Sequence, residues 1–360
     1  MTPLAGEVMV APQAVPGSDG RNHLVYELRL SNVTPGEATL SRVEVLNSAT
    51  MTPLLTWDHD TIATRLSIGG RRGAESAELG VGQFGVLFVH VAVDAKEPLP
   101  AGIIHRVTGN FKVTGGDVTM TLAPAPVIST PPVVIGPPLR GTNYVAADGC
   151  CDSIRHVRAL LPMNGRFALA QRFAIDWEQT DDDARLVKGD LKDPASYRIF
   201  GREVHAVADG VVVSSRNDLP EQVPGALPPG LPIAEADGNF VVLDIGNGAF
   251  VLFAHMQPGS VTVKAGDRVT RGQVLGRVGN TGNSQAPHLH LHVMDGPSPL
   301  LSNGIPYVID AFTLTAIDEA GTADFDRAEE SGTPLTLRKV TPPRKLKNVL
   351  PLDLTMVDFP

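Results

Sequence analysis

A proline-rich segment divides this chain into two parts. Six prolines fall within the twenty residues LAPAPVISTPPVVIGPPLRG, residues 122–141. Proline has no backbone N–H and a fixed φ, so such a segment stays extended and pairs poorly within a sheet. The chain has 360 residues, which is enough for two domains with separate cores. We therefore expect two domains joined by a linker at residues 124–140.

The first part, residues 1–123, is predicted to be an accessory β-sandwich. It contains short runs of alternating or β-rich residues between turn signals and few long helical patterns. Strands at this spacing are typical of an immunoglobulin-like sandwich. The expected strands are VYELRLS (25–31), ATLSRVEVL (38–46), VLFVHVAV (86–93) and VTMTLA (118–123).

The second part, residues 141–312, is also predicted to be a β domain. GNFVVLDIGNGAFVLFAH (238–255) has two apolar runs around an Asn-Gly turn, the pattern of a hairpin. Residues 214–238 are polar and proline-rich, which predicts a long surface loop that shapes access to a site. Residues 313–360 are expected to be a C-terminal extension wrapping one or both domains. The whole chain is thus predicted to be all-β.

Charge and hydropathy exclude several classes of protein. The formal net charge is −9, whereas nucleic-acid binding needs clustered basic residues. No stretch reaches the ~20 apolar residues of a membrane span, and the N-terminus lacks the pattern of a signal peptide. The cysteines, Cys150 and Cys151, are adjacent. A bond between neighbours closes a strained ring, so we expect buried or free thiols.

The stretch APHLHLHV, residues 286–293, places His288, His290 and His292 at every second position. Successive side chains of a strand point to opposite faces, so these three imidazoles would share one face. The simple interpretation is an exposed His-rich strand. The alternative is a metal and acid–base site, because imidazole both binds zinc and carries protons near neutral pH.

Two further residues could complete such a site. Asp176 lies in QRFAIDW and His255 in LFAHM. A hydrolytic zinc site uses about three protein ligands and leaves one position open for water. It also needs a base and donors for the developing oxyanion. The residue types fit a metal-dependent hydrolase, although spacing alone does not bring them together.

From Gln171 to Val293 the chain resembles the lysostaphin/LytM-type zinc endopeptidases, which cut peptide bridges in peptidoglycan. RFAIDW (172–177) resembles the first metal motif of that family, and EVHAVADGVV (203–212) resembles a pair of its strands. The matching pieces follow in the family's order. They end with VKAGDRVTRGQVLGRVGNTGNS (263–284) and APHLHLHV.

The resemblance implies roles for individual residues. Asp176 and His290 match zinc ligands, while His255 and His288 match the two histidines that handle the proton and stabilise the oxyanion. The fold implied is a two-layer β structure with one Zn²⁺ in a groove of the sheet.

One position departs from the family pattern. Arg172 stands where the family has its first zinc-binding histidine, and a guanidinium cannot ligate a cation. His156 in GCCDSIRH is the favoured substitute ligand. His292 and the Cys150–Cys151 pair are alternatives, and so is the absence of any substitute.

The remaining candidates have supporting roles. His292 takes the place of a usual acidic residue, and orienting a ligand is as reasonable for it as ligation. His205 is expected on a strand, facing solvent or lining the groove. Arg172 could itself dock a substrate carboxylate.

Three functions compete. The first is a zinc-dependent endopeptidase that uses metal-activated water on peptidoglycan peptides. The second is an inactive module of the same family that binds peptidoglycan peptides or regulates another hydrolase. The third, a biotin- or lipoyl-carrier domain, would need a lysine at the hairpin tip, where VTRGQV has Arg271. Because peptidoglycan lies outside the cytoplasm, the family resemblance implies an extracellular or periplasmic protein, with the cytoplasm as the alternative.

Overall fold

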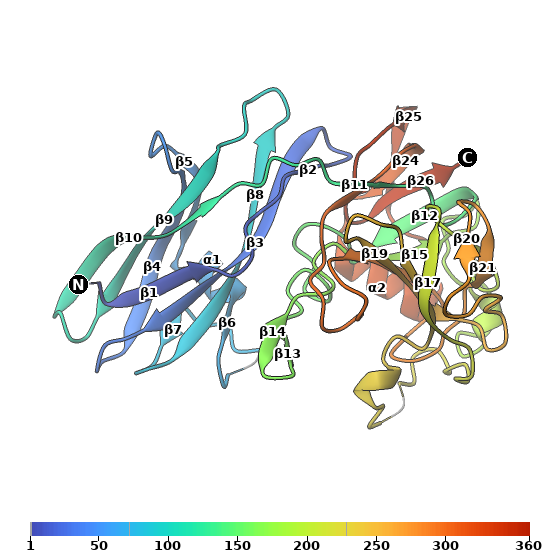
Figure 1. Cartoon of the computed structure of the whole chain (residues 1–360), viewed down its shortest axis with the longest axis horizontal. Helices are drawn as coiled ribbons and strands as arrows, with labels where there is room; N and C mark the ends of the chain where they lie inside the picture. Colours follow the sequence, from blue (N-terminus) through green and yellow to red (C-terminus); the bar gives the residue numbers. More distant parts are fainter. Residues whose placement is uncertain (1, 72, 228) are drawn as a thin grey trace. The chain divides into compact units, whose positions relative to one another are not determined.

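The computed structural model describes residues 2–71, 73–227 and 229–360. The chain forms two compact units (Figure 1). Unit 1 comprises Met1–Pro16 and Gly20–Pro131, and unit 2 comprises Gly17–Asp19 and Pro132–Pro360. Strands dominate both units, so the predicted all-β class is confirmed.

Unit 1 contains two antiparallel sheets. One sheet consists of β1 (Leu4–Val8), β3 (Arg21–Asn32), β8 (Phe84–Asp94) and β6 (Leu66–Ile68), with β2 (Val15–Pro16) paired to β3. The other consists of β10 (Gly116–Pro126), β9 (Gly102–Phe111), β4 (Ala38–Asn47) and β5 (Pro53–Asp58), with β7 (Glu78–Leu79) paired to β4.

The two sheets of unit 1 share one hydrophobic core. It contains Leu28 from one sheet and Val43 and Val107 from the other, which is the packing of a β-sandwich. Helix α1 (His59–Arg65) connects the sheets, and the side chain of Asp58 caps it by accepting a hydrogen bond from the Thr61 N–H.

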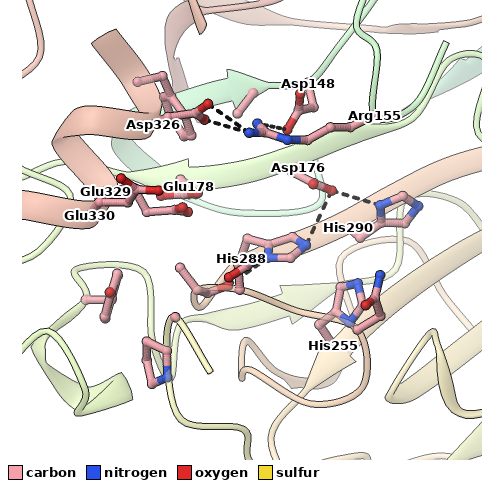
Figure 2. A pocket seen from close by; sticks show the side chains of 18 of the residues that line it. Asp148, Arg155, Asp176, Glu178, His255, His288, His290, Asp326, Glu329 and Glu330 are labelled. Carbon is pink, nitrogen blue, oxygen red and sulfur yellow. Dashed lines mark hydrogen bonds and ion pairs between the residues drawn. The ribbon is translucent and has the colours of Figure 1, made fainter. Parts of the chain in front are cut away.

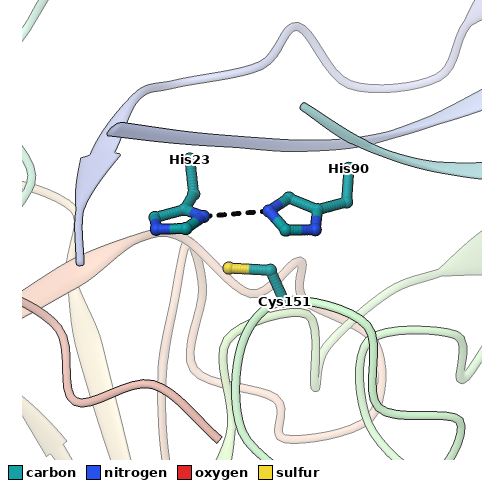
Figure 3. A group of neighbouring side chains, drawn as sticks. All are labelled: His23, His90 and Cys151. Atoms are coloured by element: carbon teal, nitrogen blue, oxygen red, sulfur yellow. Dashed lines mark hydrogen bonds between the residues drawn. The ribbon is translucent and has the colours of Figure 1, made fainter. Parts of the chain in front are cut away.

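The histidines of unit 1 make local hydrogen bonds. His23 and His90 lie on the paired strands β3 and β8, and Nδ1 of His23 is 2.9 Å from Nε2 of His90 (Figure 3). His105 bonds to the hydroxyl of Tyr26 at 2.8 Å. Burial lowers the pKa of His105 to about 4, so its ring stays neutral in the core.

Unit 2 is built on one ten-stranded sheet. In spatial order its strands are β20 (Arg268–Val269), β17 (Gly210–Arg216), β18 (Asn239–Asp244), β19 (Phe250–Met256), β22 (Leu289–Met294), β15 (Ile175–Gln179), β12 (Gly141–Ala147), β26 (Thr355–Phe359), β24 (Phe312–Asp318) and β25 (Leu337–Leu346). The expected hairpin is present as β18 and β19, and Asn247 in its turn has a φ of 54°.

Short ladders complete unit 2. They pair β11 (Val133–Ile135) with β23 (Tyr307–Ile309), β13 (Leu161–Met163) with β14 (Arg166–Ala168), and β16 (Glu203–His205) with β21 (Val274–Arg277). The proline-rich segment is therefore more than a linker, because Val133–Ile135 pairs with a strand of unit 2. The 3₁₀ turns are Pro194–Ser196 and Ile233–Glu235.

The C-terminal segment differs from the expected wrapping extension. It supplies β24, β25 and β26 to the large sheet, and β26 pairs directly with β12. It also forms helix α2 (Thr322–Ser331), which ends at Gly332 in the left-handed conformation. Phe325 and Ala328 lie on one face of this helix and are buried against a cluster that includes Val145. The segment is thus part of the core of unit 2.

The cysteines also differ from the prediction. Cys150 and Cys151 are joined by a disulfide, and both are buried. The prediction of thiols is wrong, because the two neighbouring sulfurs are bonded to each other. Along the described chain, no helix has both the length and the apolar character needed to span a membrane.

Candidate metal centre and catalytic histidines

Three neighbouring strands in the middle of the large sheet position the site. β22 lies between β15 and β19. In this register Asp176 on β15 is opposite His290 on β22, and His290 is opposite Ala254 on β19. His255 follows Ala254 directly. Residues far apart in the sequence therefore meet on adjacent strands because of the pairing register.

His156, Asp176 and His290 form a group suited to a metal ion. Their ligand atoms all lie within 4.8 Å of one another. Nδ1 of His290 is 2.8 Å from Oδ1 of Asp176, and Nε2 of His156 is 3.4 Å from Oδ2 of Asp176. Two imidazoles and a carboxylate are a ligand set that zinc accepts in catalytic sites.

His156 comes from a loop, and that loop fixes which ring nitrogen faces the site. Its Nδ1 lies 2.9 Å from the backbone carbonyl of Asp148. A carbonyl only accepts, so Nδ1 carries the proton and Nε2 presents its lone pair to Asp176. A histidine held by a carbonyl in this manner is oriented for metal binding.

His255 and His288 are held in the same manner. Nδ1 of His255 is 2.7 Å from the carbonyl of Thr281, and Nδ1 of His288 is 2.8 Å from the carbonyl of Ala286. Each Nδ1 donates, so each Nε2 is available for proton transfer. The two ring centroids are 4.6 Å apart. His255 has a φ of 61°, which is uncommon for a non-glycine residue and typical of functional positions.

The electrostatics of the site keep the Asp176 carboxylate ionised. Burial by itself would raise its pKa, but His156, His288 and His290 outweigh burial and hold the pKa well below its usual range. Burial lowers the pKa of His290, and burial together with the neighbouring imidazoles lowers the pKa of His255 strongly. The ionised Asp176 carboxylate and the lowered pKa of His290 both favour the deprotonated ligand atoms that metal binding requires.

The site opens into a cleft of about 760 Å³ (Figure 2). Asp176, His288 and His290 are among the residues that line this cleft. Pro224, Gly225 and Leu227 of the long loop form part of its lining, in agreement with the predicted role of that loop. The opposite lining comes from helix α2.

The α2 side of the cleft is rich in carboxyl groups, none of which was predicted as a site residue. Arg155 bridges Asp148 and Asp326 at 3.0 and 2.8 Å (Figure 2). Glu178 hydrogen-bonds to Glu329, and burial together with that second carboxyl raises the pKa of Glu178 well above its usual value. The only sequence signal for this wall was the spacing of Phe325 and Ala328, which predicts one buried face of a short helix.

The remaining predicted site residues lie outside the described lining of the cleft. Arg172 is buried, and its Nη1 donates to the carbonyl of Gly304 at 2.8 Å. His205 is buried on β16 and bonds through Nδ1 to the carbonyl of Gly272. Neither is positioned to meet a substrate. His292 is buried behind His290, with its Nδ1 2.9 Å from Nε2 of His290.

Comparison with known proteins identifies the domain. Residues 196–301 match the model of Peptidase family M23. This part of the chain is similar to the M23 peptidases. The match confirms the predicted resemblance to lysostaphin/LytM-type enzymes. It includes His255, His288 and His290, whereas Asp176 and His156 precede the matched residues.

Two curated relatives are similar to part of this chain. The peptidoglycan DD-endopeptidase ShyA of Vibrio cholerae is 36% identical over 179 residues, which are 45% of this chain and 37% of ShyA. The DD-carboxypeptidase/endopeptidase Mpg of Neisseria gonorrhoeae is 35% identical over 86 residues, 24% of this chain and 19% of Mpg. The chain thus spans well under half the length of these relatives.

Two solved structures align with this chain at low TM-scores. The catalytic domain of lysostaphin from Staphylococcus simulans aligns with a TM-score of 0.26 at 21% identity, over 45% of this chain and 88% of that domain. A zinc-containing peptidase from Vibrio cholerae aligns with a TM-score of 0.24 at 16% identity, over 83% of each chain.

Proposed function

We propose that unit 2 is a zinc-dependent endopeptidase that hydrolyses peptide bonds in peptidoglycan cross-links. The observation that carries the proposal is His156. Its Nε2 reaches Asp176 and completes a set of three ligands with His290, although Arg172 occupies the family's first ligand position. The donor set therefore fits zinc with one position left for water or substrate.

His255 and His288 would act beside the metal. Bound zinc would polarise the scissile carbonyl and lower the pKa of a water molecule. Either ring can accept a proton from that water at Nε2 and return it to the leaving amine, while the other would donate from Nε2 to the oxyanion in its doubly protonated form. The carbonyls of Thr281 and Ala286 hold both rings in the required tautomer.

The named relatives support a substrate and a location. ShyA is described as a peptidoglycan DD-endopeptidase and Mpg as a DD-carboxypeptidase/endopeptidase, and the description of ShyA supports a peptidoglycan peptide as the partner. Such a substrate supports a location outside the cytoplasm. The Cys150–Cys151 disulfide supports this, since disulfides persist in oxidising compartments.

The inactive binding module has less support. It depended on the Arg172 guanidinium meeting a substrate carboxylate, and this group is buried against Gly304 instead. An inactive module would have no need of His255 and His288, yet both histidines are present and their rings are oriented by backbone carbonyls.

Three histidine variants test the proposal through zinc content and peptidoglycan hydrolysis. We expect His156→Ala to lose both zinc and activity. His255→Ala should keep zinc and lose about 10²–10⁴-fold in rate, the usual contribution of acid–base catalysis. His205→Ala is the matched control, a buried histidine away from the cleft, and should keep both.

Two outcomes would contradict the assignment. A second group, His255, His288 and His290, also has its ligand atoms within 4.8 Å. If His255→Ala loses zinc while His156→Ala keeps it, that group is the metal site. If the unsubstituted chain binds no zinc, the metallopeptidase proposal fails.

A further inference from the structure

His292 is two residues after the proposed ligand His290 on β22, and the two rings are in contact. Nε2 of His290 is 2.9 Å from Nδ1 of His292, and Nδ1 of His290 is 2.8 Å from Oδ1 of Asp176. His292 is 0% exposed. A continuous row of polar contacts therefore runs from the Asp176 carboxylate through His290 into the interior of the sheet.

This row ends at an atom without a partner. Within the described part of the chain, Nε2 of His292 is buried and makes no hydrogen bond. The residue opposite His292 is Leu252, a member of an apolar cluster with Val242 and Met294. A buried polar group without a hydrogen bond destabilises the fold. The contact made by the other nitrogen of His292 has to offset this cost.

The proton positions explain what that contact does. A neutral imidazole carries one proton. If His290 binds a metal through Nδ1, its proton is on Nε2 and is donated to Nδ1 of His292. In the reverse arrangement, Nδ1–H of His292 donates to His290, and the proton of His290 on Nδ1 points at Asp176. That second arrangement blocks the metal-binding nitrogen.

We propose that His292 is a positioning residue for the metal centre. It accepts the Nε2–H of His290 and so keeps Nδ1 of His290 unprotonated and directed toward Asp176 and His156. The inference rests on the proposed function, because it concerns the zinc affinity of that site. Partners of this kind typically change metal affinity by about 10–100-fold.

Two substitutions separate this role from packing. His292→Leu keeps much of the volume and removes the acceptor, whereas His292→Asn places an amide oxygen close to the position of Nδ1. Zinc dissociation constants of the full chain are measured by competition with a chelator. We expect about 10–100-fold weaker binding for His292→Leu and binding within a few-fold of the unsubstituted chain for His292→Asn. Thermal unfolding of the metal-free variants is measured alongside.

Several results would overturn the inference. One is unchanged zinc affinity in His292→Leu. Another is an equal loss in both variants while their metal-free forms unfold like the unsubstituted chain. If His292→Leu does not fold, ¹H–¹⁵N spectroscopy of the unsubstituted, zinc-bound chain shows which ring nitrogens of His290 and His292 carry protons. Protons on Nε2 of both His290 and His292 are expected, and a proton on Nδ1 of His292 refutes the role.

The same experiment separates this inference from the function on which it rests. Zinc binding that is insensitive to His292 refutes only the inference. No zinc binding in the unsubstituted chain refutes the proposed metal centre and the role of His292 with it.

Discussion

At the scale of single residues, the Glu178–Glu329 contact places two carboxyl groups in one buried site. Burial and the neighbouring carboxyl raise the pKa of Glu178, and burial raises that of Glu329. The folded chain therefore binds a proton there more tightly than the unfolded chain does. The resulting stability is fully present below the unfolded pKa of about 4.3 and is lost as the pH rises through the folded pKa.

Replacing Glu178 with Gln should remove the part of this pH dependence that comes from Glu178. The amide can still donate to Glu329 without needing a proton from solvent. In the metal-free chain we expect Glu178→Gln to be more stable than the unsubstituted protein at pH 8, by at least about 1.4 kcal/mol, the equivalent of one pKa unit. The two should converge near pH 4.

Thermal unfolding between pH 4 and pH 8 measures this effect. Glu330→Gln, an exposed residue that also lines the cleft, is the control and should follow the unsubstituted chain. Parallel pH profiles for Glu178→Gln and the unsubstituted chain would show that the carboxyl pair does not hold the proton.

The sequence identified some site residues better than others. Asp176, His255, His288 and His290 could be proposed because they stand in motifs, and the alternation of the His-rich strand puts His288 and His290 on one face. His156 could be proposed only as one substitute among several, since its approach depends on the path of a loop. Glu178 and Glu329 were missed because their contact arises from a helix packing against a strand.

At the scale of elements, Gly238 and Thr281 show how turn geometry supports a catalytic side chain. Gly238 has a φ of 63°, and a Cβ there would overlap the carbonyl of Thr281. That carbonyl accepts the Nδ1–H of His255. A side chain at residue 238 would therefore displace the group that orients His255.

Gly238→Ala should lower peptidase activity more than 10-fold while zinc remains bound. The positive φ by itself costs about 1–2 kcal/mol, and the overlap adds to it. Gly259→Ala is the control, because Gly259 has a φ of 72° with open space around it. Activity and thermal unfolding are compared, and equal effects of the two substitutions would show that Thr281 does not orient His255.

Strands were easier to predict than their order in the sheet. The β18–β19 hairpin follows from a local turn and local alternation. The place of β26 beside β12 does not, because these strands are separated by most of unit 2 in the sequence. Helix α2 was missed because the spacing of Phe325 and Ala328 is a weak local signal among mostly polar residues.

At the scale of the whole molecule, the C-terminal segment completes the sheet that holds the site. β26 covers one edge of β12, which pairs with β15, the strand that carries Asp176. The segment also supplies many buried apolar side chains to unit 2. They include Phe312, Leu314, Phe325, Leu335, Leu350, Met356, Val357 and Phe359.

A chain ending at residue 311 should therefore lose the fold of unit 2. Each buried side chain of this kind contributes roughly 1.5–3 kcal/mol, so the sum of their contributions is comparable to or larger than the roughly 5–15 kcal/mol stability of a typical domain. Zinc binding should disappear, and adding residues 312–360 as a separate peptide should restore part of it. Unit 1 has its own core and should keep its dispersed NMR signals. Zinc binding at full affinity by the truncated chain would instead show that these strands only cover a domain that folds without them.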